Sequence, residues 1–288
     1  MTARKARRVS LAPDATTSEA FLSITAECTE HWRANVAGVR EDRDVESLHQ
    51  LRVGVRRFRS ALSLFARPLD DPQLRWLNDE LRECALPFGA GRDLDVFLAG
   101  SHTAGLSDAE LARLSDRREQ AYDTIARILD STQWQDAWLL VDRFRAAAPW
   151  GLDPDPPAVE TATDILERRW RRVVKRGSTL RTLTPTERHR VRIQAKKLRY
   201  GAQFFADLFP KGPQAVGTPP LQFATGIGEL QDALGQLNDT YTDGHFLTSL
   251  GRSVPAVDEV VLLEQSIDAH AHVLRLQPFW RVPSDRSR

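Results

Sequence analysis

The sequence predicts an all-α protein built from two similar helical halves. Apolar residues recur every three or four positions along most of the chain, and the strict alternation typical of strands is almost absent. A basic stretch at residues 48–65 recurs at residues 187–205, an offset of 140 residues. That period is too long for a stacked solenoid, so it favours duplication: two halves of four or five helices around a pseudo-two-fold axis.

The composition is typical of a globular protein in a reducing compartment. The 288 residues include 27% charged and 41% hydrophobic residues, and the net charge is only +1. No apolar run is long enough to predict a membrane span, and the basic N-terminus lacks the apolar segment of a signal peptide. Cys28 and Cys84 do not form a disulfide framework. We therefore expect a cytoplasmic protein.

Capping residues and breakers divide the first half into helices. Asp71 can cap a helix whose first turn holds Pro72, whereas Pro87 and Gly89–Gly91 predict a break or kink farther along that helix. Residues 1–16 are expected to be a disordered or loosely attached basic tail that could contribute to ligand binding. The helices of this half are expected from residue 17 to about 40, from 45 to before 68, from 72, from 108, and over 132–147.

The second half begins after the Pro-rich stretch 149–157. Thr184, Pro185 and Glu187 form the start signal of the second basic helix, as N-cap, first residue and capping-box partner, and we expect this helix to run to about Phe209. Other helices are expected over 158–176, 221–250 and 256–274. The predicted organisation is a basic tail (1–16), a first half (17–148), a linker (149–157), a second half (158–276) and a C-terminal tail (277–288).

Each basic stretch places its cations on one helical face, opposite an apolar face. Acids are missing from Ser47 to Leu69, and the 32 residues from Arg168 to Arg199 contain one acid, Glu187. The apolar face of the first stretch comprises Leu48, Leu51, Val55, Phe58, Leu62 and Phe65. The basic faces comprise His49, Arg52, Arg56, Arg59 and, at the flank, Arg57 in the first copy, and His189, Arg192, Lys196, Lys197 and Arg199 in the second.

Three interpretations of these faces stay open. A row of like charges can be a solvated surface, or it can pair with buried acids such as Asp93, Asp95 and Asp239. It can also bind a polyanion, because Arg donates in pairs to phosphate oxygens, and Lys and His add positive charge. Few aromatic residues share the charged faces, with Tyr200 falling beside His189, which argues against base stacking and single-stranded nucleic acid. Duplex nucleic acid remains an alternative.

Four motifs in order give the chain a resemblance to the CHAD domain, the conserved histidine α-helical domain family. The H-Q-x-R-V-x-x-R-R-x-R-S segment begins at His49, and R-D-L-D-V begins at Arg92. R-I-x-x-K-K-L-R-Y begins at Arg192, and L-Q-D-x-L-G-x-L-N-D begins at Leu230. The resemblance covers about residues 18–273. It implies a duplicated helical fold that binds inorganic polyphosphate in a central basic groove or pore. The chain departs from the family at Phe88, where Leu is usual.

The residues and the resemblance together predict a stand-alone binding module for inorganic polyphosphate, and for granules that contain it. The ten residues of the two basic faces are the expected phosphate contacts, with Arg57 and Lys197 the least well placed. Arg33, Arg171 and Lys175 are candidates for additional contacts. Asp93, Asp95 and Asp239 are expected to cap helices or anchor arginines, and no metal or cofactor is expected. The chain lacks a P-loop, and His270 and His272 should point to different faces, so we expect no enzyme. A polyphosphate-processing or phosphohistidine-forming enzyme is the alternative.

Overall fold

A computed structural model describes residues 2–148, 150, 152–210, 212–253 and 258–281, without the side chains of 101, 102, 213 and 238–245. The described residues are helices and connecting turns, with one isolated bridge between Thr16 and Pro157. The chain divides into two compact units. Unit 1 comprises residues 1–8 and 21–153, and unit 2 comprises residues 9–20 and 154–288. The predicted all-α class is confirmed.

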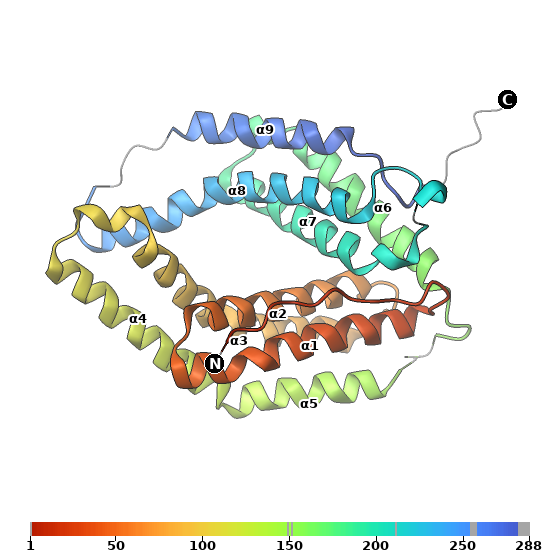
Figure 1. Cartoon of the computed structure of the whole chain (residues 1–288), viewed down its shortest axis with the longest axis horizontal. Coiled ribbons are helices and arrows are strands. Elements are labelled where there is room, and N and C mark those ends of the chain that lie inside the picture. The colour runs from red at the N-terminus through yellow and green to blue at the C-terminus, as the bar shows by residue number, and fades with distance from the viewer. Residues whose placement is uncertain (1, 149, 151, 211, 254–257, 282–288) are drawn as a thin grey trace. The chain divides into compact units, whose positions relative to one another are not determined.

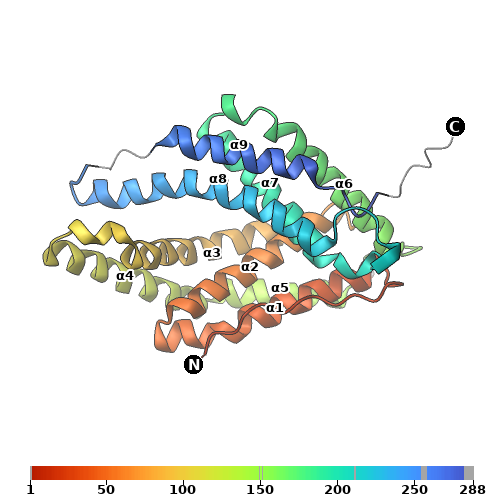
Figure 2. The ribbon, with the colours of Figure 1, turned by 45° about the horizontal axis from the view of Figure 1, so that its top comes forward.

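Unit 1 is a bundle in which α2 packs on α3, and α3 packs on α4 and α5 (Figures 1 and 2). The first turn of α1 belongs to unit 2 and the rest of α1 to unit 1. The helices are α1 (Thr17–Asp42), α2 (Val45–Phe65), α3 (Pro72–Ala99), α4 (Asp108–Leu129) and α5 (Thr132–Ala146), with the 3-10 turn η1 (Ser101–Gly105).

Trp32 of α1 is fully buried at the centre of unit 1. Its ring lies 5.0 Å from that of Phe58 on α2 and 4.2 Å from that of Trp138 on α5. Gly54 lets α2 approach α1 closely, because a Cβ there would lie 2.7 Å from the Cβ of Trp32 and 3.0 Å from its backbone. The predicted apolar face of α2 is buried at every position, which turns the opposite face of α2 outward.

In unit 2, α7 packs against α6 and α8, and α9 lies along α8 (Figures 1 and 2). Trp170 of α6 contacts Phe223 of α8 at 5.5 Å between ring centroids, and Phe223 also contacts Trp280 at 5.1 Å. The helices are α6 (Ala158–Gly177), α7 (Pro185–Phe204), α8 (Pro220–Ser249) and α9 (Glu259–Arg275), with 3-10 turns η2 (Leu180–Thr182), η3 (Ala206–Leu208) and η4 (Gly212–Gln214).

The predicted helix starts are confirmed by hydrogen bonds. The Asp71 side chain accepts a bond from the backbone N–H of Gln73, with Pro72 in the first turn of α3. Thr184 and Glu187 form a reciprocal capping box at the start of α7, because each side chain accepts from the backbone N–H of the other. This cap fixes where α7 begins, and so fixes which side chains share its basic face.

Two predictions about helix ends are wrong. Of the break or kink predicted around Pro87, the break is wrong: α3 continues to Ala99, and buried residues on both sides of Pro87 pack the helix into unit 1. The helix α7 ends at Phe204 and not near Phe209, because the chain tightens into η3, where Phe205 accepts a 3-10 bond from Leu208. The start predicted for the last helix, at residue 256, falls outside the described residues.

The N-terminal segment is held in place, so the prediction of a disordered or loosely attached tail is wrong. The backbone N–H of Arg4 donates to Asn35 Oδ1 at 2.9 Å, and Asn35 Nδ2 donates back to the Arg4 carbonyl at 2.9 Å. Farther along, Val9 and Leu11 are buried. Apolar residues within this basic segment supply the burial that a loose tail would lack.

No helix in the part of the chain that the structure describes is long and apolar enough to cross a membrane. Cys28 and Cys84 are both free and buried. Burial raises the pKa of the Cys28 thiol to about 12, which keeps it protonated at neutral pH. Both cysteines therefore act as small core residues of unit 1.

Candidate functional site

Four predicted cations of α2 form what we call the unit-1 basic face: His49, Arg52, Arg56 and Arg59, all half-buried. Their side chains lie opposite the apolar face that packs into unit 1. Arg52 Nη1 lies 4.0 Å from Asp93 Oδ1 on α3, at the limit of an ion pair, and the Arg52 side chain is 37% exposed. This guanidinium is therefore positioned by α3 while it remains accessible.

His49 is surrounded by cations from two helices. Burial lowers the pKa of His49, and Arg92 on α3, together with Arg56 and Arg52 on α2, lowers it further; only Glu46 opposes them. Arg92 was not among the residues predicted to bind phosphate. Its signal in the sequence is the R-D-L-D-V segment, which it opens. We include Arg92 in the unit-1 basic face.

Arg59 extends the same face toward the start of α3. Its Nε donates to the carbonyl oxygen of Asn78 at 3.2 Å, which fixes the guanidinium against α3. Burial lowers the pKa of Arg59, and the nearby charge of Arg82 lowers it further, against the opposing charges of Asp79 and Glu83. Arg59 thus carries a partly desolvated positive charge, which a bound anion would stabilise.

Arg57 does not belong to the unit-1 basic face, and its assignment as a direct phosphate contact is corrected. Only 6% of the residue is exposed. Both terminal nitrogens donate to the carbonyl oxygen of Arg7 at 3.3 Å. Arg57 lies at the flank of the helical wheel, where the N-terminal segment covers it. Its guanidinium therefore binds the protein's own backbone.

In unit 2, α7 carries what we call the unit-2 basic face: His189, Arg192, Lys196, Lys197 and Arg199. His189 is exposed and the other four are half-buried. Arg192 Nε donates to the carbonyl oxygen of Gln231 on α8 at 3.3 Å. The guanidinium of Arg199 lies 5.4 Å from the ring of Tyr200. All five predicted residues are thus brought together on one helix, and α8 positions Arg192.

A glycine on the neighbouring helix lies beside the equivalent arginine in each unit. A Cβ at Gly89 of α3 would lie 3.8 Å from Arg52 Nη2, and a Cβ at Gly235 of α8 would lie 3.3 Å from Arg192 Nη2. The two glycines are 146 residues apart: Gly235 lies in the motif that begins at Leu230, and Gly89 lies three residues before the motif that begins at Arg92. A Cβ at Gly235 would shift the end of the Arg192 side chain by a few tenths of an ångström, whereas a Cβ at Gly89 would make an ordinary contact with Arg52.

Arginines on α6 add positive charge beside α7. Arg169 Nη1 donates to Gln194 Oε1 of α7 at 3.2 Å. Burial, together with the charges of Arg172 and Arg168, lowers the pKa of Arg169 to about 10. The prediction did not single out this cluster, although the run of cations from residue 168 to 176 was its signal. It extends positive charge from α7 onto α6 within unit 2.

The structure describes the side chains of two of the three predicted acids. Asp95 is buried and accepts bonds from Arg118 Nε at 2.7 Å and from the Tyr122 hydroxyl at 2.8 Å, so it anchors α4 to α3. This agrees with its predicted role as an arginine anchor. Asp93 approaches Arg52 only at 4.0 Å. The side chain of Asp239 lies outside the described residues.

Of the three residues predicted to make additional phosphate contacts, two pair with acidic side chains and the third is exposed on α6. Arg33 lies over the Trp138 ring at 4.2 Å and pairs with Asp142 at 3.4 Å, which directs it toward α5. Arg171 pairs with Glu167 at 2.7 Å, one turn away on α6. Lys175 is exposed. Among the residues that the structure describes, Lys175 is the only one of these three that does not pair with an acidic side chain.

Two further predictions concern aromatic and metal-binding residues. Tyr200, expected beside His189, is buried and stacks on Phe204 with 6.0 Å between ring centroids. His270 is buried and His272 is half-buried and bonded to Glu229, so the two point to different faces as predicted. Among the described residues, no group of three or more His, Cys, Asp or Glu side chains could hold a metal ion.

A family model and one solved structure indicate the same family for this chain. The model of the CHAD domain matches residues 23–248. The fold is similar to the crystal structure of the CHAD domain from the plant Ricinus communis, with a TM-score of 0.77 and 28% identity over 96% of this chain and 98% of that chain. It is also similar to PptA from Streptomyces chartreusis, with a TM-score of 0.53 and 16% identity over 90% of this chain and 96% of that chain, a likeness of fold alone. No curated protein gives a significant match. Because the family model spans most of the sequence, the chain belongs to the CHAD domain family.

Proposed function

We propose that this protein binds inorganic polyphosphate through its basic faces and acts as a non-catalytic binding or targeting module. The observation that carries the proposal is the dense, partly desolvated positive charge on α2 and α7. A surface of this kind is unfavourable by itself, because like charges one turn apart repel each other. A bound polyanion removes that repulsion.

The extent of each face favours a chain of phosphates over a single phosphate. From His49 to Arg59, α2 rises about 15 Å, and cations occur at each turn in between. A single phosphate would be satisfied by two or three donors, whereas a linear polyanion can contact the whole row. The backbone bonds of Arg59 and Arg192 hold these guanidinium groups ready for such a ligand.

The absence of aromatic side chains from the charged faces supports inorganic polyphosphate over single-stranded nucleic acid. Stacking of bases needs exposed aromatic rings, and Tyr200 and Phe58, the ring-bearing neighbours in these helices, are buried. Duplex nucleic acid would need only backbone contacts, so it is the competing ligand to test. Membership of the CHAD family also supports the proposal, because the resemblance to this family implies polyphosphate binding. This support is independent of the geometry of the basic faces.

The ligand is tested by equilibrium binding of polyphosphate to the full chain at physiological salt, with duplex DNA as competitor. We expect saturable binding that DNA displaces only at a large excess of phosphate. Displacement by DNA at equal phosphate concentration would reassign the partner to nucleic acid.

The non-catalytic role is tested separately, by incubation of the same complex with and without divalent metal ions. We expect the polyphosphate length distribution to stay unchanged on a gel and the protein mass to stay unmodified. Chain shortening, or a phosphorylated histidine, would replace the binding role with an enzymatic one.

A further inference from the structure

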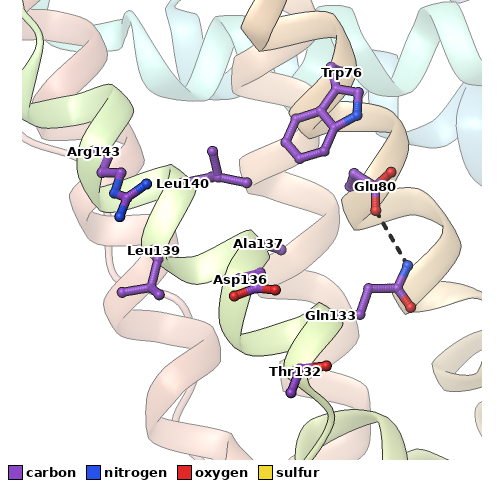
Figure 3. A pocket seen from close by; sticks show the side chains of 9 residues that line it. All are labelled: Trp76, Glu80, Thr132, Gln133, Asp136, Ala137, Leu139, Leu140 and Arg143. Carbon is purple, nitrogen blue, oxygen red and sulfur yellow. Dashed lines mark hydrogen bonds between the residues drawn. The ribbon is translucent and has the colours of Figure 1, made fainter.

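A groove on the surface of unit 1 lies between α3 and α5, and none of the residues of the unit-1 basic face lines it. It encloses about 510 Å³ (Figure 3). A second hollow of about 320 Å³ continues it and shares Trp76, Leu140 and Arg143. We call this the α3/α5 groove, defined by Trp76, Glu80, Asp136, Leu139, Leu140 and Arg143.

The middle of the α3/α5 groove is apolar and exposed. Trp76 on α3 is 48% exposed, and Leu139 on α5 is 54% exposed. Leu140 and Ala137 also line the groove, and Leu140 points toward Trp76 (Figure 3). Large apolar side chains gathered on one surface are typical of an interaction site, whereas isolated ones are not.

The two ends of the α3/α5 groove carry opposite charges. Glu80 and Asp136 lie toward the start of α5, where Gln133 Nε2 donates to Glu80 Oε2 at 3.3 Å, and Arg143 lies toward the other end (Figure 3). Asp136 and Arg143 are seven residues apart, so they share one face of α5 about two turns, or about 10 Å, from each other. Neither makes an ion pair within the part of the chain that the structure describes.

This arrangement is complementary to itself. A two-fold axis through the middle of the groove brings the Arg143 end of one copy to the Glu80 and Asp136 end of the other, and it brings apolar centre against apolar centre. Each contact then occurs twice. We propose that the α3/α5 groove is a homodimer interface, and that its occupant is the same groove of a second copy of this chain. The proposal does not depend on what the basic faces bind.

The first test is the oligomeric state of the full chain by sedimentation velocity across a range of concentrations. We expect a reversible dimer, and we expect Trp76→Ser to weaken it. Truncation of a central aromatic anchor weakens an interface about tenfold, and because the anchor occurs in both copies, the dimer dissociation constant should rise about a hundredfold. Leu86→Ser is the matched control, since Leu86 lies on the same helix and is 55% exposed but does not line the groove.

The second test reverses the charges and does not depend on Trp76. In a dimer of the Arg143→Glu variant, three acidic side chains would face one another at each end of the interface. In a dimer of the Glu80→Lys/Asp136→Lys variant, three basic side chains would face one another there. Each variant should be monomeric at concentrations where the wild type is dimeric. An equimolar mixture of the two should form a mixed dimer, because the charges are again opposite at each end. Far-UV circular dichroism checks that each variant is folded.

A chain that stays monomeric at concentrations of about 0.1 mM, where interfaces of modest affinity are populated, would overturn the proposal. So would a dimer that survives Trp76→Ser and both charge variants, because such a dimer would use another surface. Failure of the variant mixture to associate, with each variant folded, would also contradict the two-fold arrangement.

Discussion

The charge of the unit-1 basic face depends on pH through the protonation of His49. Burial and the neighbouring arginines hold its pKa below the usual 6.5, so the ring is neutral at pH 7 in the free protein. The unfolded chain binds more protons than the native one as the pH falls below about 6.5, so this ring makes the fold less stable with falling pH. A bound polyanion reverses the electrostatics, because negative charge favours the protonated ring.

We therefore predict that polyphosphate binding raises the pKa of His49 and takes up a proton near neutral pH. The measurement is an NMR titration of the histidine ring signals with and without saturating polyphosphate, with His49→Gln to assign the signal. A His49 pKa that polyphosphate leaves unchanged would place the ligand elsewhere. The rings of His31 and His270, which are buried and lie on neither α2 nor α7, serve as internal references.

Arg57 illustrates how far a helical wheel predicts the role of a residue. The wheel correctly turned Arg52, Arg56 and Arg59 away from the core, because the apolar face of α2 fixes the rotation of the helix. The wheel could not predict whether the side chain of Arg57, at the flank, is exposed or covered. That depended on the N-terminal segment, whose carbonyl at Arg7 receives the guanidinium. Contacts between segments 50 residues apart leave no local signal in the sequence.

The two arginines should therefore respond differently to the same substitution. Arg57→Met leaves the Arg7 carbonyl without its donor, and should lower the free energy of unfolding by about 1–3 kcal/mol with little change in polyphosphate affinity. Arg52→Met should do the opposite and leave stability within about 0.5 kcal/mol. Urea denaturation and equilibrium binding measure the two effects. Equal loss of affinity in both variants would return Arg57 to the basic face.

At the scale of elements, the approach of α2 to α1 in unit 1 depends on Gly54. A Cβ there would lie 2.7 Å from the Cβ of Trp32, and neither helix can yield without opening the core. Gly54→Ala should lower the free energy of unfolding by about 1–3 kcal/mol through overpacking. Gly105→Ala is the control, because a Cβ at Gly105 meets nothing within 4 Å. Equal thermal and urea stability of the two variants would show that α1 and α2 are not packed this closely.

Elements with strong local signals were predicted well, and those decided by packing were not. Capping residues specified the starts of α3 and α7, since the side-chain bonds at Asp71 and Thr184 are local. Pro87 predicted a break or kink because Pro removes one helical hydrogen bond and crowds the preceding turn. In the structure, buried neighbours such as Cys84 and Phe88 hold the helix on both sides of it. Burial outweighs one lost hydrogen bond.

At the scale of the whole molecule, the near-zero net charge conceals strong segregation. The chain carries 40 basic and 39 acidic residues, yet no acidic residue of α2 is part of the unit-1 basic face. Likewise, no acidic residue of α7 is part of the unit-2 basic face. Pairs such as Arg118 with Asp95 place acids against other helices. The repeat in the sequence predicted both faces, because equivalent residues recur at a fixed offset. Arg92 and Arg169 were missed because their contribution depends on packing between helices.

Segregated charge predicts a strong dependence of binding on salt. Each phosphate that a cation neutralises releases a counterion, so the logarithm of the affinity should fall linearly with the logarithm of the salt concentration. Arg56→Gln should make that slope less steep by about the amount that one phosphate contact contributes, whereas Arg113→Gln on α4 should leave the slope unchanged. Affinity that does not vary with salt would contradict an electrostatic interface.

The central claim is most directly tested by the polyphosphate affinity of the double variant Arg52→Glu/Arg192→Glu, measured beside wild type and a matched Arg113→Glu/Arg127→Glu control with the same change of net charge. Two charge-assisted contacts worth roughly 1.5–3 kcal/mol each are lost and replaced by repulsion, so the affinity should fall at least about a hundredfold. The helical circular dichroism signal should stay unchanged, and the control should bind like wild type. Binding that survives in the double variant, or falls equally in the control, would contradict the assignment of the two basic faces as the polyphosphate site.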